Sequence, residues 1–106
     1  IRMFYEQRQE YPDNYPDAQN WPDYSKPPVE FFEGFYADTA TSGSALAIDT
    51  ADRFFDDGSV LFGTDYPFSP ERGRRALRRT VEAIDSLEMD DDRREAIYGG
   101  NLEAII

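Results

Sequence analysis

The chain has 106 residues, of which 40% are hydrophobic and 15% aromatic, and this composition places it among globular rather than disordered chains. Its 22 acidic against 11 basic residues give a formal net charge of -11, which repels phosphate backbones and anionic membrane surfaces. We therefore expect neither a nucleic-acid nor a membrane partner. Cysteine and histidine are absent, so the chain offers no disulfide framework and no thiolate or imidazole metal ligand.

The choice of charged residues is biased, because Lys26 is the single lysine and Asp outnumbers Glu by 13 to 9. A hydrated acidic surface is typical of halophilic proteins, and a GC-rich genome, which favours Arg over Lys, explains the bias equally well. No run approaches the roughly 18 apolar residues of a membrane span, and the start lacks the apolar region of a signal peptide, so a cytoplasmic protein is expected. The first residue is not Met, which suggests that sequence precedes it.

Residues 1–34 are expected to form an aromatic- and Pro-rich loop region with short helices. A helix is predicted over residues 3–10, and turn-forming clusters follow at 11–17 and 20–24. Pro27 and Pro28 predict a further helical turn, with prolines in its first positions. The clusters contain aromatic residues, which are rare in disordered segments and are expected here to pack on a neighbouring surface: Tyr11, Tyr15, Trp21 and Tyr24.

Residues 35–106 alternate strands and helices. A strand is predicted at 35–40, and a helix capped by Ser44 follows until Asp57 and Gly58 end it. Residues 59–64 form a continuous apolar run, as expected for a strand covered on both faces of a parallel sheet. This order predicts an α/β fold built from βαβ units.

Two more helices are predicted after the second strand. Ser69, Pro70 and Glu71 are expected to cap and begin the first of them. One face of this helix carries Leu77, Val81, Ile84 and Leu87, and the other carries Arg72, Arg75, Arg78 and Arg79. Asp90 or Asp91 is expected to start the second helix, with Gly99 and Gly100 as its C-cap and Asn101 capping a closing turn.

Asp65 is the most informative candidate for a functional residue. It lies at the carboxyl end of the predicted strand at 59–64, the edge where parallel α/β folds bind their ligands. A carboxylate at this edge can hold a divalent cation or orient a water molecule. The structural alternative is that Asp65 only begins the loop to the next helix, where an aspartate before a proline-containing turn is common.

The sequence FGTDYPF at residues 62–68 resembles the last barrel strand of the amidohydrolase-related family (amidohydrolase 2) that includes aminocarboxymuconate semialdehyde decarboxylase. The FYADTA run at 35–40 resembles that family's seventh strand, and IYGGNL at 97–102 resembles its closing Gly-Asn turn. The PPVEFF stretch at 27–32 is similar to the loop and helix before strand seven. Motifs in the correct order are more specific than a single one.

This resemblance implies that the chain is the C-terminal βαβα portion of a (β/α)8 TIM barrel, with residues 35–106 supplying the last two βα units and the terminal helix. It also implies that Asp65 is both the metal ligand and the catalytic, water-orienting acid of a metal-dependent enzyme, with zinc the expected metal. The reaction implied is hydrolysis or non-oxidative decarboxylation of a small carboxylated substrate. Histidine ligands would come from earlier strands, so the isolated chain is expected to be inactive. A homo-oligomer, or the missing N-terminal part of the barrel, is the expected partner.

Other residues near the strand ends are given structural roles. Asp38 is expected to bond neighbouring backbone, and Asn101 to cap a helix. Ser42, Thr64 and Tyr66 lie on loops and are expected to serve packing or turns. The alternative function is a free-standing acidic α/β module without catalysis that binds a protein through its aromatic loop.

Overall fold

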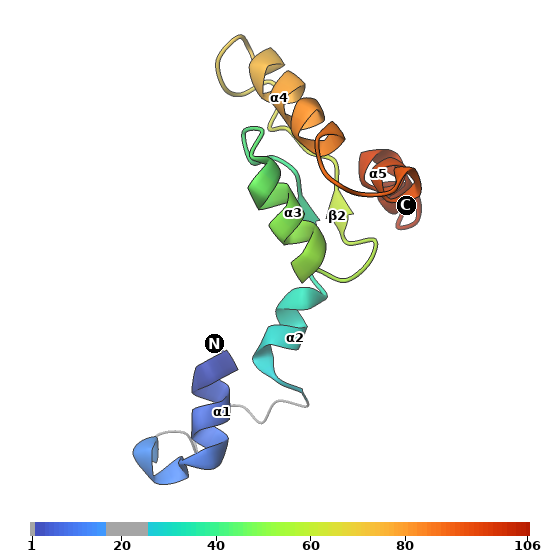
Figure 1. Cartoon of the computed structure of the whole chain (residues 1–106). Helices are drawn as coiled ribbons and strands as arrows, with labels where there is room; N and C mark the ends of the chain where they lie inside the picture. The colour runs from blue at the N-terminus through green and yellow to red at the C-terminus, as the bar shows by residue number, and fades with distance from the viewer. Residues whose placement is uncertain (1, 17–25) are drawn as a thin grey trace. The chain divides into compact units, whose positions relative to one another are not determined.

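The computed structural model describes residues 2–16 and 26–106, which form two compact units, Ile1–Gly34 and Phe35–Ile106 (Figure 1). The first unit contains the helix α1 (Arg2–Glu10), the 3-10 helix η1 (Pro12–Asn14) and the helix α2 (Pro28–Glu33). Both helices predicted in this region are confirmed. Trp21 and Tyr24 lie outside the described residues, whereas the Tyr15 hydroxyl donates a hydrogen bond to Gln7 Oε1 at 2.7 Å.

The second unit is built on two parallel strands, β1 (Ala37–Asp38) and β2 (Val60–Leu61). Ala37 lies opposite Val60, and Asp38 lies opposite Leu61. Both predicted strands exist but are shorter than the six-residue runs at 35–40 and 59–64. Within the described part of the chain each strand pairs only with the other, and their backbone bonds extend from the Ala37 amide, which donates to Ser59, to the Thr39 amide, which donates to Leu61.

The helix α3 (Ala45–Phe54) begins as predicted, because the Ser44 side chain accepts a hydrogen bond from the Ala47 amide at 3.3 Å. It ends at Phe54, and Gly58 then takes a left-handed conformation, with φ of 84°, on the way into β2. Ile48 is the fully buried residue of this helix, whereas Leu46 is 78% exposed. These two apolar residues therefore lie on different sides of α3.

The helix α4 (Arg74–Asp85) begins later than the sequence predicts. Ser69 does not cap it and Pro70 is not its first residue, because Ser69 and Glu71 have φ of 80° and 61° in a turn that precedes the helix. Gly73 is the N-cap, with φ of 81°. A methyl group on Gly73 would lie 2.9 Å from the Tyr66 ring, so the loop after β2 packs closely against Gly73. The helix begins only after this contact.

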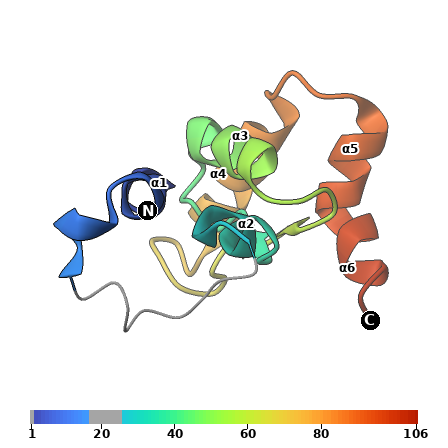
Figure 2. The same cartoon turned by 90° about the horizontal axis from the view of Figure 1, so that it is seen from below.

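The buried face of α4 also differs in part from the prediction. Ile84 is fully buried as expected, but Leu77 is exposed, and small residues take the inner positions instead: Ala76, Thr80 and Ala83. The four arginines predicted for the outer face are exposed. Small inner residues allow α4 to pack closely on α3, and the two helices lie next to each other in Figure 2.

The C-terminal helices form one continuous segment, so the predicted C-cap at Gly99 and Gly100 is wrong. The helix α5 (Asp91–Glu95), capped by the Asp90 carboxylate, continues into the π-helical segment η3 (Ala96–Gly100) and then into α6 (Asn101–Glu103). Asn101 is therefore not a cap but an internal residue, and its side-chain amide donates to the Val60 carbonyl at 2.8 Å. This bond ties the C-terminal segment to β2.

The core of the second unit combines residues from α3, α4 and η3: Ile48, Ala83, Ile84 and Ile97. Phe62 and Tyr98 pack against it with ring centroids 5.4 Å apart. The Tyr98 hydroxyl donates to Asp85 at 2.9 Å, and burial, reinforced by this carboxylate, raises the pKa of Tyr98 to about 12. Arg93 joins α5 to the end of α3, because its guanidinium bonds the carboxylates of Asp52 and Asp57.

Candidate site at the carboxyl edge of the sheet

Asp65 follows β2 at the carboxyl edge of the sheet, after Phe62, Gly63 and Thr64. It is exposed, has φ of 56°, and its backbone carbonyl accepts a hydrogen bond from the Phe68 amide at 2.8 Å. Within residues 2–16 and 26–106, no hydrogen bond or ion pair involves its carboxylate. The backbone fixes the turn, and the side chain is left available for a ligand.

The strand end before Asp65 is held by a threonine side chain. Thr39 is fully buried, and its hydroxyl both donates to the Gly63 carbonyl at 2.9 Å and accepts from the Gly63 amide at 3.0 Å. The Thr39 amide also donates to the Leu61 carbonyl at 3.1 Å. The Thr39 hydroxyl therefore continues the pairing of the two strands where the regular ladder has ended, two residues before Asp65.

Asp38 lies against the same glycine. A methyl group on Gly63 would be 2.9 Å from Asp38 Cβ and 3.2 Å from its Oδ2, so glycine at position 63 makes room for the Asp38 side chain. The other carboxylate oxygen of Asp38 accepts from the Ala40 amide at 2.8 Å, which confirms the predicted bond to neighbouring backbone. Asp38, the last residue of β1, and Asp65, which follows β2, thus lie at the carboxyl ends of neighbouring parallel strands.

The loop that carries Asp65 is anchored to the start of α4. The Gly73 amide donates to the Ser69 carbonyl at 3.3 Å, and Glu71 forms an ion pair with Arg78 at 2.7 Å. The hydrogen bond and positive charge of Arg78 lower the pKa of Glu71, and Arg75 adds a smaller effect of the same sign. Of the other loop residues with predicted turn roles, Thr64 accepts from the Tyr66 amide at 3.3 Å.

The hydrogen bonds of Thr39 predict a loss of stability in the Thr39→Val variant. Valine keeps the shape but leaves the part-buried Gly63 amide and carbonyl without their partner, which costs about 1–3 kcal/mol. Thr80→Val is the matched control, because Thr80 is also fully buried and its hydroxyl has no partner. Urea denaturation should show a lower midpoint for Thr39→Val and an unchanged or higher one for Thr80→Val. Equal midpoints for the two variants would contradict the assigned role of Thr39.

The residues of this chain fit a divalent metal only in part. Asp65 supplies one unpaired carboxylate at the strand ends, and carboxylate oxygen is a suitable ligand for zinc and for harder cations. The chain has no histidine or cysteine, and in the part that the structure describes no three Asp or Glu side chains are grouped so that they could hold a metal ion. The described residues therefore offer one candidate ligand and not a complete coordination sphere.

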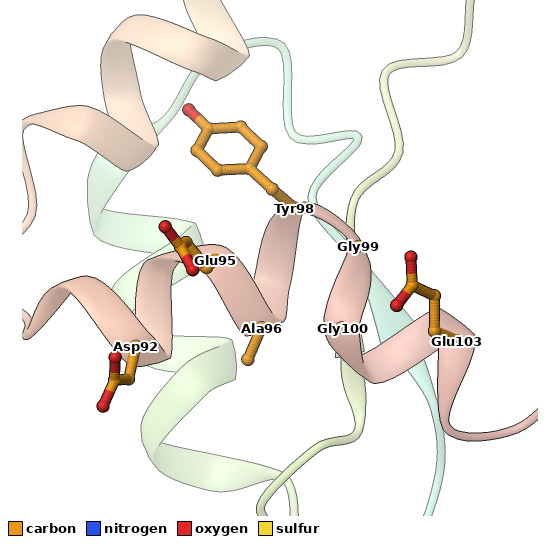
Figure 3. A pocket seen from close by; sticks show the side chains of 7 residues that line it. All are labelled: Asp92, Glu95, Ala96, Tyr98, Gly99, Gly100 and Glu103. Atoms are coloured by element: carbon orange, nitrogen blue, oxygen red, sulfur yellow. The ribbon is translucent and has the colours of Figure 1, made fainter.

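Apart from the sheet edge, a pocket of about 580 Å³ lies along the C-terminal helices (Figure 3). Its lining includes the carboxylates of Asp92, Glu95 and Glu103, and Figure 3 shows them spaced along the helical segment on either side of Gly99 and Gly100. Tyr98 also borders this hollow, but its hydroxyl is bonded to Asp85 of α4. The three acids are not grouped as metal ligands.

Two parallel strands connected by a helix, with an unpaired acid beyond their carboxyl ends, define an α/β protein with a candidate ligand site at the sheet edge. The chain belongs to the amidohydrolase family, whose model, described as "Amidohydrolase", matches residues 8–105. The match begins at residue 8, whereas the segments that resemble the family in sequence begin at residue 27. It therefore also includes the aromatic-rich part of residues 1–34. No curated protein and no solved structure matches the chain. Among the described helices, none has the length and apolar character needed to cross a membrane.

Proposed function

We propose that the chain forms the last two βα units and the terminal helices of a (β/α)8 barrel enzyme, a metal-dependent amidohydrolase-type hydrolase or decarboxylase. The observation that carries the proposal is the unpaired Asp65 carboxylate at the carboxyl edge of parallel strands in a chain of this family. Active sites of (β/α)8 barrels lie at that edge and are built from residues at the ends of several strands. Asp65 then contributes to a site shared with other strands.

The exposed surface of the second unit supports a larger barrel. Its parallel strands pair only with each other within the described residues, and parallel sheets are normally covered on both faces and extended at both edges. Large apolar side chains around the sheet and on α3 are exposed, among them Tyr36 at 58%, Leu46 at 78% and Phe68 at 75%. Neighbouring βα units would bury such side chains.

The chemistry proposed for Asp65 is that of a metal ligand and proton acceptor. A divalent ion held here, with zinc as our choice, would supply the Lewis-acid chemistry that makes water acidic near neutral pH. Asp65 would orient water and accept its proton, while the turn closed by the Phe68 amide and the hydrogen bonds between Thr39 and Gly63 hold its backbone in position. The remaining ligands come from residues outside these 106, because the chain contains no histidine. The substrate is a small carboxylated molecule.

The test is metal binding by the Asp65→Asn variant of the intact protein. Loss of a charged ligand should weaken zinc binding by at least about tenfold. Mutation of residues that only hydrogen-bond to a metal ligand already lowers metal affinity by about 10- to 100-fold. Asp38→Asn is the matched control, because it removes the same charge from the neighbouring strand end and an amide oxygen can still accept from the Ala40 amide. Competition titration with a chelating dye measures both affinities. Equal affinities in the wild type and Asp65→Asn would remove Asp65 from the metal site.

The family match also bears on the alternative of a free-standing binding module. It extends over both the aromatic segment and the two βα units, which favours one enzyme domain over a loop specialised for protein binding. A monomer that folds stably from these 106 residues alone would favour the module.

A further inference from the structure

A small cavity of about 180 Å³ lies between the loops that follow the two strands and the first turns of α4. Ser42 lines it from the loop after β1, and Ser69 and Pro70 line it from the loop after β2. Helix α4 contributes Arg75, Ala76 and Arg79. The polar residues that border the cavity are thus two serines and two arginines, and neither Asp nor Glu borders it.

The two arginines are notable because the chain as a whole carries a charge of -11. In the described part of the chain, ion pairs involve Arg53, Arg78, Arg93 and Arg94, and none includes Arg75 or Arg79. Glu71, the nearest acid in the loop, is bonded to Arg78 at 2.7 Å. The charge of Arg75 acts on this carboxylate more weakly than that of Arg78, and neither Arg75 nor Arg79 forms an ion pair in the described part of the chain.

The position of the cavity matches the site of reaction proposed above. Arg75 and Arg79 are four residues apart, so they lie on the same face of α4. That face meets the loop after β1, because a methyl group on Gly43 would lie 2.3 Å from Arg79 Cβ. The loop after β2 contains both Asp65 and Ser69. An anion held in the cavity would therefore sit at the same edge of the sheet as Asp65.

We propose that this cavity, lined by Ser42, Ser69, Arg75 and Arg79, is a binding site for the anionic group of a small ligand, either a carboxylate or a phosphate. Guanidinium groups bind both oxyanions through paired, charge-assisted hydrogen bonds, and serine hydroxyls can donate further bonds. Such a subsite would hold the substrate by its charged group next to the strand end that carries Asp65. That the bound anion is a group of the substrate rests on the proposed function, whereas the binding of an anion in this cavity does not.

The experiment is calorimetric titration of the intact protein with inorganic phosphate and, separately, with acetate. The Arg75→Gln/Arg79→Gln variant should bind the preferred anion at least about tenfold more weakly than the wild type. The Arg72→Gln/Arg74→Gln variant is the matched control, because it removes two exposed arginines from the same stretch of chain but outside the cavity. Its affinity should stay within about twofold of the wild type.

The outcomes separate the possibilities. Tighter binding of phosphate than of acetate would assign the cavity to a phosphate-bearing ligand, and tighter binding of acetate would assign it to a carboxylate. No measurable binding of either anion, or equal weakening by both double variants, would overturn the proposal. Asp65→Asn should keep its anion affinity. If only Asp65→Asn loses affinity for the anion, the anion binds at the metal and the cavity is not the site. If the arginine variants show no cavity binding but Asp65→Asn still weakens zinc binding, the proposal for the cavity fails and the role of Asp65 stands.

Discussion

Replacing Asp65 by asparagine in the intact enzyme is expected to lower kcat by about 100- to 10,000-fold, the range for loss of a positioned proton acceptor. Asparagine has nearly the same size and can still occupy the turn, in which the Asp65 carbonyl accepts from the Phe68 amide. It cannot accept the proton of a water molecule. Because the side chain is exposed and makes no bond in the described part of the chain, stability should stay almost unchanged.

Steady-state kinetics at saturating zinc separates this effect from weaker metal binding. Under these conditions Asp38→Asn should keep a kcat within a few-fold of the wild type, because its backbone bond to Ala40 survives the substitution. A wild-type kcat in zinc-loaded Asp65→Asn would show that Asp65 takes no part in the reaction.

The largest expected effect on stability is that of Gly43→Ala. Gly43 has φ of 82°, and an added methyl group would lie 2.3 Å from Arg79 Cβ and 2.9 Å from the Arg79 backbone carbon. A left-handed conformation costs about 1–2 kcal/mol for a residue with a side chain. Overpacking against backbone costs a further 1–3 kcal/mol or so. The variant should therefore lose several kcal/mol of unfolding free energy, with α4 displaced from the loop after β1.

Gly99→Ala provides the control for this substitution. Nothing lies within 4 Å of a methyl group at Gly99, which belongs to the helical segment η3. Alanine is better than glycine in a helix by about 0.5–1 kcal/mol, so this variant should be unchanged or slightly more stable. Urea denaturation of both variants measures the difference. A Gly43→Ala variant as stable as Gly99→Ala would mean that the loop after β1 does not pack on α4 as described.

The sequence predicts the second unit well where local signals and long-range packing agree. The run before Asp65 contains a strand, although a shorter one than predicted, the helix capped by Ser44 begins as expected, and Asp90 caps α5 as one of the two acids considered. These features depend on neighbouring residues, so a pattern of a few positions is enough to detect them. The alternation of strands and helices then leaves parallel pairing as the simplest arrangement.

The errors arise where tertiary contacts override a local signal. Ser69, Pro70 and Glu71 have the sequence of a helix start, but packing of Gly73 against Tyr66 and Pro67 delays α4 until Arg74. Gly99 and Gly100 have the sequence of a helix end, yet the chain continues because Asn101 reaches back to the Val60 carbonyl. Neither contact is visible in a local pattern.

For the candidate site, the sequence singles out Asp65, and its role as a metal ligand stays a prediction. The position of Asp65 after an apolar strand was sufficient to single it out, and the structure leaves its carboxylate unpaired. The role of Thr39 was missed, because a threonine in a predicted strand gives no sign that its hydroxyl bonds a glycine 24 residues away. The cavity at Arg75 and Arg79 is not predicted either, since the sequence only places these arginines on the face of the helix opposite its apolar residues.

The most direct measurement is a crystal structure of the intact, zinc-loaded protein with anomalous diffraction at the zinc edge. The proposed function predicts a zinc ion with an Asp65 carboxylate oxygen at about 2.0–2.2 Å, and with histidine nitrogens from other strands completing the site. A zinc ion coordinated without Asp65, or an anomalous signal found only away from the carboxyl edge of the sheet, would contradict it.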